Sequence, residues 1–353
     1  MKNTPSPILF FCVLLLNLPL VREASASIAP DSLAHFDPIP RKIINPAIDL
    51  IIRSEYERAQ SYILEHTEKN SIIRDFLIAS LHHARMGELE SSEGSGMFLE
   101  CVSLVTGKAE DILSSDHGNV TARFYLGTVK SYLAVYYNRE GQFLKSISTA
   151  RAAVGELEKC IAKNHDFPEP FLVIGSYNYW KSAKNFLRFL PGIPDKRDEA
   201  VREIRKNLLP GSVSYALGLN QLAWILIDFK RYDEAESLLR EALHRYPGSR
   251  FFLYPAGILA QKQKEWDNAS HYFGQMAESL QSDRLNNRSI WIKVSLKQAD
   301  CLYQMAQYDA AVRVCRNIRQ TTIHPDEREK AGKLITQASR LEHACVQMQR
   351  QKN

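Results

Sequence analysis

The chain has 353 residues, of which 45 are Lys or Arg and 40 are Asp or Glu, so its formal net charge is +5. A charge this small, with no block of Lys and Arg residues, excludes the strongly basic surface that nucleic-acid-binding proteins use. Hydrophobic residues make up 45% of the chain, which is enough for a sizeable core and excludes a disordered protein.

The N-terminus has the three parts of a secretory signal peptide. Lys2 precedes an apolar run at 8–21, and the small residues 24–26 (Ala-Ser-Ala) form a cleavage site. The apolar run is shorter than the ~20 residues of a membrane-spanning helix, so a cleaved signal peptide at 1–26 is favoured over an uncleaved anchor. We therefore expect an exported protein, periplasmic or extracellular.

Residues 27–115 are predicted to form an N-terminal helical region. Apolar periodicity predicts helices at 71–86 and 100–114. The Gly- and Ser-rich stretch 87–96 is predicted to be the turn-rich connector between them.

Five stretches share one helical pattern. Each begins with an aromatic residue, has a small residue three positions later and a further small or apolar residue four positions after that. This is the i, i+3, i+7 spacing of an amphipathic helix. The aromatic residues are Tyr56, Phe143, Tyr232, Trp266 and Tyr308, and the small residues three positions later are Ala59, Ser146, Ala235, Ala269 and Ala311.

Another apolar helix is predicted before each of the last three stretches. We call this preceding helix the first helix of a hairpin and the aromatic-led stretch its second helix. The first helix carries a small residue 12 positions before the small residue of the stretch that follows. Small residues on both facing surfaces let two helices cross at close distance, so each pair is predicted to be an antiparallel hairpin. The residues predicted to pack at these crossings are Ala223, Ala235, Gly257, Ala269, Ala299 and Ala311.

The hairpins recur with a fixed period. Ala223 and Gly257 are 34 residues apart, as are Ala235 and Ala269, and Pro247 closes the first of these units. A 34-residue helix–turn–helix with small residues at these positions resembles the tetratricopeptide-repeat (TPR) family. The resemblance implies an all-α fold, an α–α superhelix of antiparallel hairpins.

The resemblance also implies how the chain is divided. TPR-like repeats are expected over 116–320, most clearly at 217–318, and a capping helix at 321–353. One degenerate repeat, at Tyr56, is expected within the N-terminal region 27–115. In this combination of signal peptide and repeats, the chain is similar to exported bacterial TPR proteins.

The stretch 171–200 departs from the repeat pattern. Gly175 suits a first helix, but Ala200, the small residue of its partner helix, comes 13 positions late, which indicates an insertion near 180–200. Three cations at i, i+3 and i+7 share a helical face with aromatic neighbours. This strip is predicted either to bind a peptide carboxylate, an anionic lipid or a glycan, or to be a solvated face with its aromatic rings in the core. Its residues are Tyr177, Trp180, Lys181, Lys184 and Arg188.

The sequence contains no catalytic or metal-binding pattern. H-E-x-x-H, Walker and G-x-S-x-G motifs are absent, and the histidines lack ligand spacing. The five cysteines after the signal peptide include no C-x-x-C pair and are predicted to be small buried residues, which is favoured over a single disulfide such as Cys301–Cys315. We therefore expect no enzyme activity, no catalytic residue, no cofactor and no metal.

The sequence thus predicts a non-enzymatic scaffold or adaptor of the cell envelope. Stacked TPR-like hairpins leave a concave groove, formed by the first helices, that accepts a peptide or protein segment. The alternative is a small-ligand or lipid-binding TPR protein with its pocket around the insertion at 171–200. A hydrolase or transferase is the third hypothesis, for which the sequence supplies no motif. Expected partners are a protein or peptide and no nucleic acid, and the apolar residues 186–194 suggest peripheral proximity to a membrane without an anchor.

Overall fold

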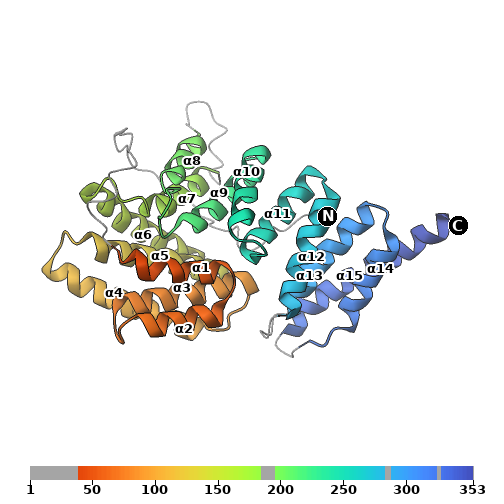
Figure 1. The fold of residues 1–353 in the computed structure, drawn as a ribbon, viewed down its shortest axis with the longest axis horizontal. Helices are drawn as coiled ribbons and strands as arrows, with labels where there is room; N and C mark the ends of the chain where they lie inside the picture. Colours follow the sequence, from red (N-terminus) through yellow and green to blue (C-terminus); the bar gives the residue numbers. More distant parts are fainter. Residues whose placement is uncertain (1–38, 184–194, 283–287, 324–326, 353) are drawn as a thin grey trace. The chain divides into compact units, whose positions relative to one another are not determined.

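The computed structural model describes residues 39–183, 195–282, 288–323 and 327–352, and every regular element in these ranges is helical. Helices α1 to α15 follow one another along the chain (Figure 1). The predicted all-α fold of antiparallel helices is confirmed. None of the described helices is long and apolar enough to cross a membrane.

The described residues form two compact units, and each is considered by itself. The first unit contains residues 39–51, 55–87 and 92–225, and the second contains residues 52–54, 88–91 and 226–352. Two short turns from the N-terminal part of the chain, 52–54 and 88–91, therefore belong to the second unit.

The first unit is built from helices that pack in chain order, with α4 on α5, α5 on α6, α6 on α7 and α7 on α8. Its core is rich in aromatic side chains, among them Phe76, Phe124, Tyr125 and Phe167, whose rings contact one another. The helices are α1 (Arg41–Ile52), α2 (Tyr56–His66), α3 (Ile72–Leu89), α4 (Ser95–Ser115), α5 (Val120–Arg139), α6 (Phe143–Lys163), α7 (Pro170–Ala183), α8 (Arg197–Arg205) and the first part of α9 (Tyr215–Asp228).

The second unit continues the same arrangement of successive helices. Each helix from α10 to α14 packs on the next one, and the last helix, α15, packs on both α13 and α14. Leu302, Ala311, Val312 and Cys345 form a buried cluster between these three helices. The helices are α10 (Tyr232–Arg245), α11 (Arg250–Gln263), α12 (Trp266–Ser282), α13 (Arg288–Gln304), α14 (Tyr308–Gln320) and α15 (Arg328–Lys352).

All five predicted second helices begin at their aromatic residue, and the turn before each has the same geometry. The residue two positions before the aromatic has a positive φ, and the next N–H donates to the carbonyl five residues back. This is the hydrogen-bond pattern by which a helix ends in the left-handed region, so the chain reverses sharply from first to second helix. The residues with positive φ are Ser54, Gly141, Lys230, Lys264 and Ala306.

The six small residues predicted to pack at helix crossings are all buried. At Gly257 a Cβ atom would lie 2.6 Å from the ring of Phe273 on α12, so the Phe273 ring packs directly against the backbone of α11. In the first unit the same position of the hairpin α5–α6 is held by a hydrogen bond, because Ser146 Oγ donates to the carbonyl of Ala134 at 2.8 Å.

The connector predicted at 87–96 is shorter than expected. Helix α3 runs to Leu89 and α4 begins at Ser95, so only residues 90–94 join them. Gly94 precedes α4 with φ +84°, and Glu90 has φ +47° although it carries a side chain. The turn thus reverses the chain within a few residues, and Glu88 and Glu90 at the C-terminal end of α3 contact side chains of other helices.

Candidate functional site

The aromatic residues of the predicted strip on α7 lie in the core. Tyr177 and Trp180 are 7% and 2% exposed, and the Trp180 ring meets that of Tyr179 edge-on at 5.1 Å. Lys181 is exposed, with its Nζ 5.9 Å from the centre of the Tyr177 ring. The other two predicted residues, Lys184 and Arg188, lie outside the described residues. The burial of both aromatics favours the solvated-face alternative over a binding strip for the described part, and a ligand role for the strip stays a prediction.

Helix α7 buries these rings because it packs tightly on α8. A Cβ atom at Gly175 would lie 3.0 Å from the carbonyl oxygen of Ala200 and 2.6 Å from Ile204. Ala200 therefore faces Gly175, although it follows 25 residues later in the sequence. Beside this crossing, Asn178 donates a hydrogen bond to Glu203 at 2.9 Å, and burial raises the pKa of that carboxyl group.

The second unit contains a cluster of buried charges that joins three helices to the turn 88–91. Arg250 at the start of α11 pairs with Glu88 at 2.7 Å, and the two side chains are only 3% and 7% exposed. Ser54 Oγ also donates to Glu88, at 2.6 Å. Lys293 of α13 pairs with Glu90 at 2.5 Å. We call Arg250, Lys293 and Lys330 of α15 the cation cluster, because all three contact the carboxylates of this turn.

The cation cluster continues into a row of side chains along α11 and α13. Lys293 Nζ lies 5.6 Å from the centre of the Tyr254 ring, and one turn further along Lys297 Nζ donates to Gln261 Oε1 at 3.3 Å. Gln261 in turn contacts Cys301 Sγ through its Nε2 at 3.4 Å. Positive and amide groups thus follow one another along two first helices of the predicted repeats, and the Tyr254 ring beside Lys293 is buried.

Electrostatics distinguish the two lysines of this row. Burial by itself would lower the pKa of Lys293, but the Tyr254 hydroxyl and the Glu90 carboxylate outweigh it, so this pKa is raised. The pKa of Lys297 is lowered by burial and by the charge of Lys293. The carboxylates of the turn therefore satisfy Lys293, whereas Lys297 contacts an amide oxygen and the ring of Phe273.

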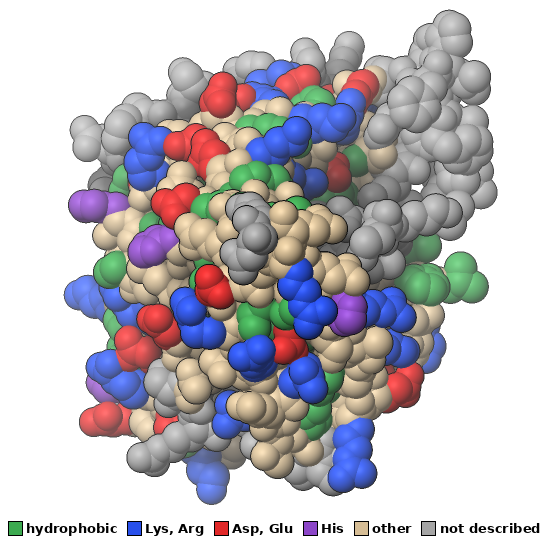
Figure 2. Space-filling model, turned by 90° about the vertical axis from the view of Figure 1, so that its right-hand side faces the viewer, with side chains coloured by type: hydrophobic (Ala, Val, Ile, Leu, Met, Phe, Trp, Pro, Cys, Tyr) green, Lys and Arg blue, Asp and Glu red, His purple; other side chains and the backbone are tan. Residues whose placement is uncertain are grey.

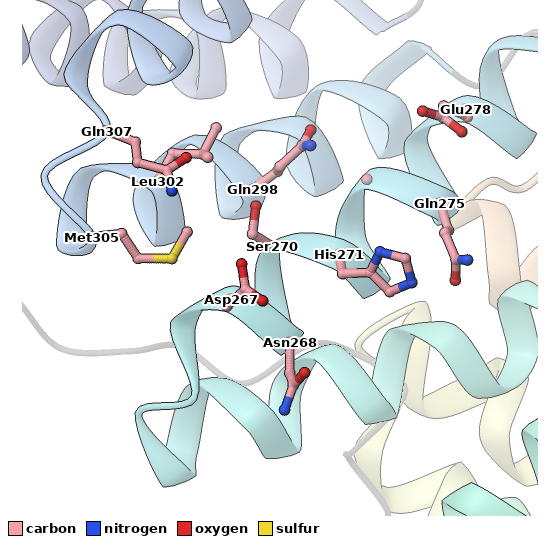
Figure 3. A pocket seen from close by; sticks show the side chains of 11 residues that line it. Asp267, Asn268, Ser270, His271, Gln275, Glu278, Gln298, Leu302, Met305 and Gln307 are labelled. Carbon is pink, nitrogen blue, oxygen red and sulfur yellow. The ribbon is translucent and has the colours of Figure 1, made fainter.

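A polar pocket of about 470 Å³ lies between α12, α13 and the turn to α14. Figure 3 shows amide, carboxylate and hydroxyl groups around its edge, with Leu302 and Met305 on the α13 side. Gln298 lies over Gly274, where a Cβ atom would be 2.8 Å from its Nε2. The side chains that line the pocket include neither Lys nor Arg, so its chemistry differs from that of the cation cluster.

No three His, Cys, Asp or Glu side chains in the described ranges converge as a metal-ligand set. His83 is stacked on Tyr132 at 4.4 Å, and burial lowers its pKa to about 3, so it is neutral at physiological pH and packed as an aromatic ring. All five described cysteines are buried free thiols.

The sequence did not single out the cation cluster or the turn that it contacts. Glu88 and Glu90 were part of a predicted connector, and their partners lie more than 150 positions away in the sequence. The signal that could have drawn attention is the i, i+4 spacing of Lys293 and Lys297 in a predicted first helix. Figure 2 shows Lys and Arg interspersed with Asp and Glu on the face that it presents, so burial, more than the number of cations, sets this cluster apart.

The comparisons with known proteins agree with the helical hairpins. The tetratricopeptide repeat family matches residues 221–249, which contain the end of α9 and all of α10. The chain thus contains a tetratricopeptide-type repeat at 221–249 within an all-helical fold. Proteins built from TPR-type repeats are in general protein-interaction scaffolds. No curated protein matches the chain in sequence.

Three solved structures are similar to this TPR-type chain at low sequence identity. The apo form of RapI is 15% identical, with a TM-score of 0.41, over 83% of this chain and 79% of RapI. Yeast Tom70 is 12% identical, with a TM-score of 0.36, over 80% of this chain and 66% of Tom70. The human IFIT1 dimer with PPP-AAAA is 13% identical, with a TM-score of 0.33, over 90% of this chain and 83% of IFIT1.

Proposed function

We propose that this TPR-type chain is a non-enzymatic scaffold or adaptor that binds a protein or peptide segment on the first-helix surface of its second unit. The supporting observation is the row along α11 and α13, where Gln261, Lys293 and Lys297 place amide and cationic groups side by side, with the Tyr254 ring buried beside Lys293. Such a mixture can contact the side chains and the main chain of a peptide together.

A turn of the same chain, at Glu90, contacts this part of the second unit. Lys330 donates to the backbone carbonyl of Glu90 at 3.0 Å and also lies 3.4 Å from its carboxylate. A side chain of α15 thus contacts both main-chain and side-chain oxygens of a turn, as recognition of a peptide requires. The alternative, a small-ligand or lipid pocket around 171–200, includes residues outside the described ranges and gains no support from α7, whose aromatic rings are packed in the core.

Site-specific photo-crosslinking in the native cells tests the proposed surface. A photo-reactive amino acid at position 297 on α13 should capture a defined protein partner. The same group at position 240, an exposed site on the second helix α10, is the matched control and should not capture it. Equal capture from both positions would contradict the assignment of binding to the first helices.

We also propose that the protein acts outside the cytoplasm, at the cell envelope, because the sequence begins with the features of a signal peptide. N-terminal sequencing of the protein purified from its own cells should begin at Ser27. Recovery of a chain that still begins at Met1 would remove the support for export.

A further inference from the structure

The cation cluster holds two carboxylates from its own chain in a nearly closed environment. The Glu88 and Glu90 side chains are each 7% exposed, although Glu is a residue that proteins seldom bury. Three helices supply their partners, Arg250 from α11, Lys293 from α13 and Lys330 from α15. Carboxylates buried this far are retained only where charges and hydrogen bonds replace water.

The turn 88–91 presents these carboxylates from a tight backbone. Glu88 and Leu89 end α3, and Glu90 follows with a left-handed φ of +47°. The last carbonyls of a helix carry a partial negative charge, so this end of α3 adds to the negative charge of the two side chains. The turn is therefore a compact acidic group that fits the positive surface opposite it.

The positive row extends further than the turn does. Lys297 lies one helical turn beyond Lys293, and its Nζ contacts the oxygen of Gln261 and the ring of Phe273. The one acidic residue on its own helix, Asp300, has a pKa that burial raises, and the contacts of Lys297 Nζ named above are to groups other than this carboxylate. An acidic segment longer than the turn could thus contact more cations than Glu88 and Glu90 do.

We propose that the turn 88–91 is an internal ligand of a carboxylate-binding site formed by the cation cluster, and that an acidic segment of a protein partner takes this site in its place. This inference rests on the proposed function and adds to it the chemistry of the partner and the group that competes with it. Because the turn is covalently attached, it is present at a high effective concentration. A partner binds tightly only when its own carboxylates outnumber those of the turn or when the turn is weakened.

The test uses the mature chain and a fluorescent peptide with the sequence of residues 86–93, Met-Gly-Glu-Leu-Glu-Ser-Ser-Glu. Glu90→Gln is the informative variant, because Lys293 and Lys330 are 20% and 49% exposed and can be solvated when the carboxylate is removed. Glu88→Gln is avoided, since it would remove the carboxylate that pairs with the buried Arg250 guanidinium and could unfold the chain.

Removal of the Glu90 carboxylate should increase the affinity for the peptide by about tenfold or more, because a larger fraction of the protein is then competent to bind. Glu236→Gln, which removes a carboxylate from an exposed ion pair with Arg240 on α10, is the matched control and should bind as weakly as the wild type. Adding Lys293→Gln to Glu90→Gln should abolish the gain. A peptide with Gln at the positions of Glu88 and Glu90 should not bind, and circular dichroism should show that every variant is folded.

Two results would overturn the inference. If Glu90→Gln is folded and binds the peptide no better than Glu236→Gln, the turn does not compete for a ligand. Alternatively, the gain could persist when Lys293 is replaced, in which case the cation cluster is not the site. Capture of a partner from position 297 in the wild type is independent of both results, so the scaffold function can stand or fall separately.

Discussion

At Gly257 the backbone of α11 lies directly against the ring of Phe273 on α12. A Cβ atom there would be 2.6 to 2.9 Å from three ring carbons, and Phe273 is completely buried, so the ring has no room to move. Gly155 in the middle of α6 is different, because a Cβ atom at that position would meet no other atom within 4 Å. The same substitution should therefore act in opposite directions at the two sites.

Gly257→Ala is expected to lower the free energy of unfolding by about 1–3 kcal/mol, the usual cost of forcing an extra methyl group into a packed core. Gly155→Ala is expected to raise it by about 0.5–1 kcal/mol, because alanine loses less backbone entropy in a helix. Urea unfolding of the two variants and the wild type measures both changes. Changes of the same sign would show that the close approach of α11 and α12 is wrong.

Protonation of His83 should reduce the stability of the folded chain at low pH. Its ring is stacked on Tyr132, and burial, with a smaller contribution from the charge of Arg139, lowers its pKa from 6.5 to about 3. Between these two values the unfolded chain binds a proton that the folded chain does not. The free energy of unfolding should therefore fall as the pH falls from about 6.5 towards 3.

His83→Phe keeps a flat ring against Tyr132 and removes the proton-binding group. The pH dependence of its unfolding free energy should be less steep than that of the wild type, by up to about 1.4 kcal/mol per pH unit. Urea unfolding between pH 7 and about pH 4 gives the two slopes. His244→Gln, at an exposed position on α10, should leave the slope unchanged. Parallel curves for wild type and His83→Phe would contradict this role of His83.

At the scale of elements, the turns between first and second helices share one left-handed residue. Gly141 occupies it once, whereas Ser54, Lys230, Lys264 and Ala306 carry a Cβ atom at φ values near +60°. A non-glycine residue in this region is strained by about 1 kcal/mol or more. The fold accepts this cost because each turn aligns two helices that bury a large apolar surface.

Replacement of the strained alanine should stabilise its turn. Ala306→Gly is expected to raise the free energy of unfolding by about 0.5–1 kcal/mol, since relief of strain outweighs the greater entropy of glycine in the unfolded chain. Ala310→Gly, four residues later within α14, should lower it by about 1 kcal/mol because that backbone is helical. Thermal unfolding compares the two variants, and a loss of stability for Ala306→Gly would contradict the turn geometry.

The sequence predicts the second helices well because their signal is local. An aromatic residue followed by a small one marks each start, and all five helices begin at that residue. The left-handed turn residues are not recognisable in the same way. Glycine often indicates a positive φ, whereas Ser, Lys and Ala do not. The backbone conformation of these turn residues is set by the packing of the two helices that they join, and a local sequence pattern does not contain that information.

The candidate site was less predictable than the fold for a related reason. The cation cluster draws Arg250, Lys293 and Lys330 to Glu88 and Glu90 across more than 150 positions of sequence, and no local pattern connects them. The strip on α7 shows the same limit, since i, i+4 spacing put Tyr177 beside Lys181 but left open whether the ring faces the core or solvent. Spacing gives the face of a helix, whereas only packing decides whether that face meets solvent or protein.

At the scale of the whole molecule, both units contain cysteines whose reactivity can be used to follow unfolding. Cys101 and Cys160 lie in the first unit, and Cys301, Cys315 and Cys345 lie in the second. All five are buried, and burial raises the pKa of Cys160 and Cys315 to about 12 and that of Cys101 and Cys301 to about 11. Since the thiolate is the reactive form, none of these thiols should react while its unit is folded.

Thiol labelling should therefore follow unfolding of each unit. In native buffer at about pH 8 a chain that begins at Ser27 should show almost no reaction with a disulfide reagent, and in strong denaturant all five of its thiols should react. At intermediate denaturant, mass spectrometry should find Cys301, Cys315 and Cys345 labelled together, because the helices α13 to α15 that carry them pack on one another and helical repeats unfold with their neighbours. Labelling of Cys345 alone would show that α15 detaches independently, and rapid reaction in native buffer would contradict the burial of the thiols.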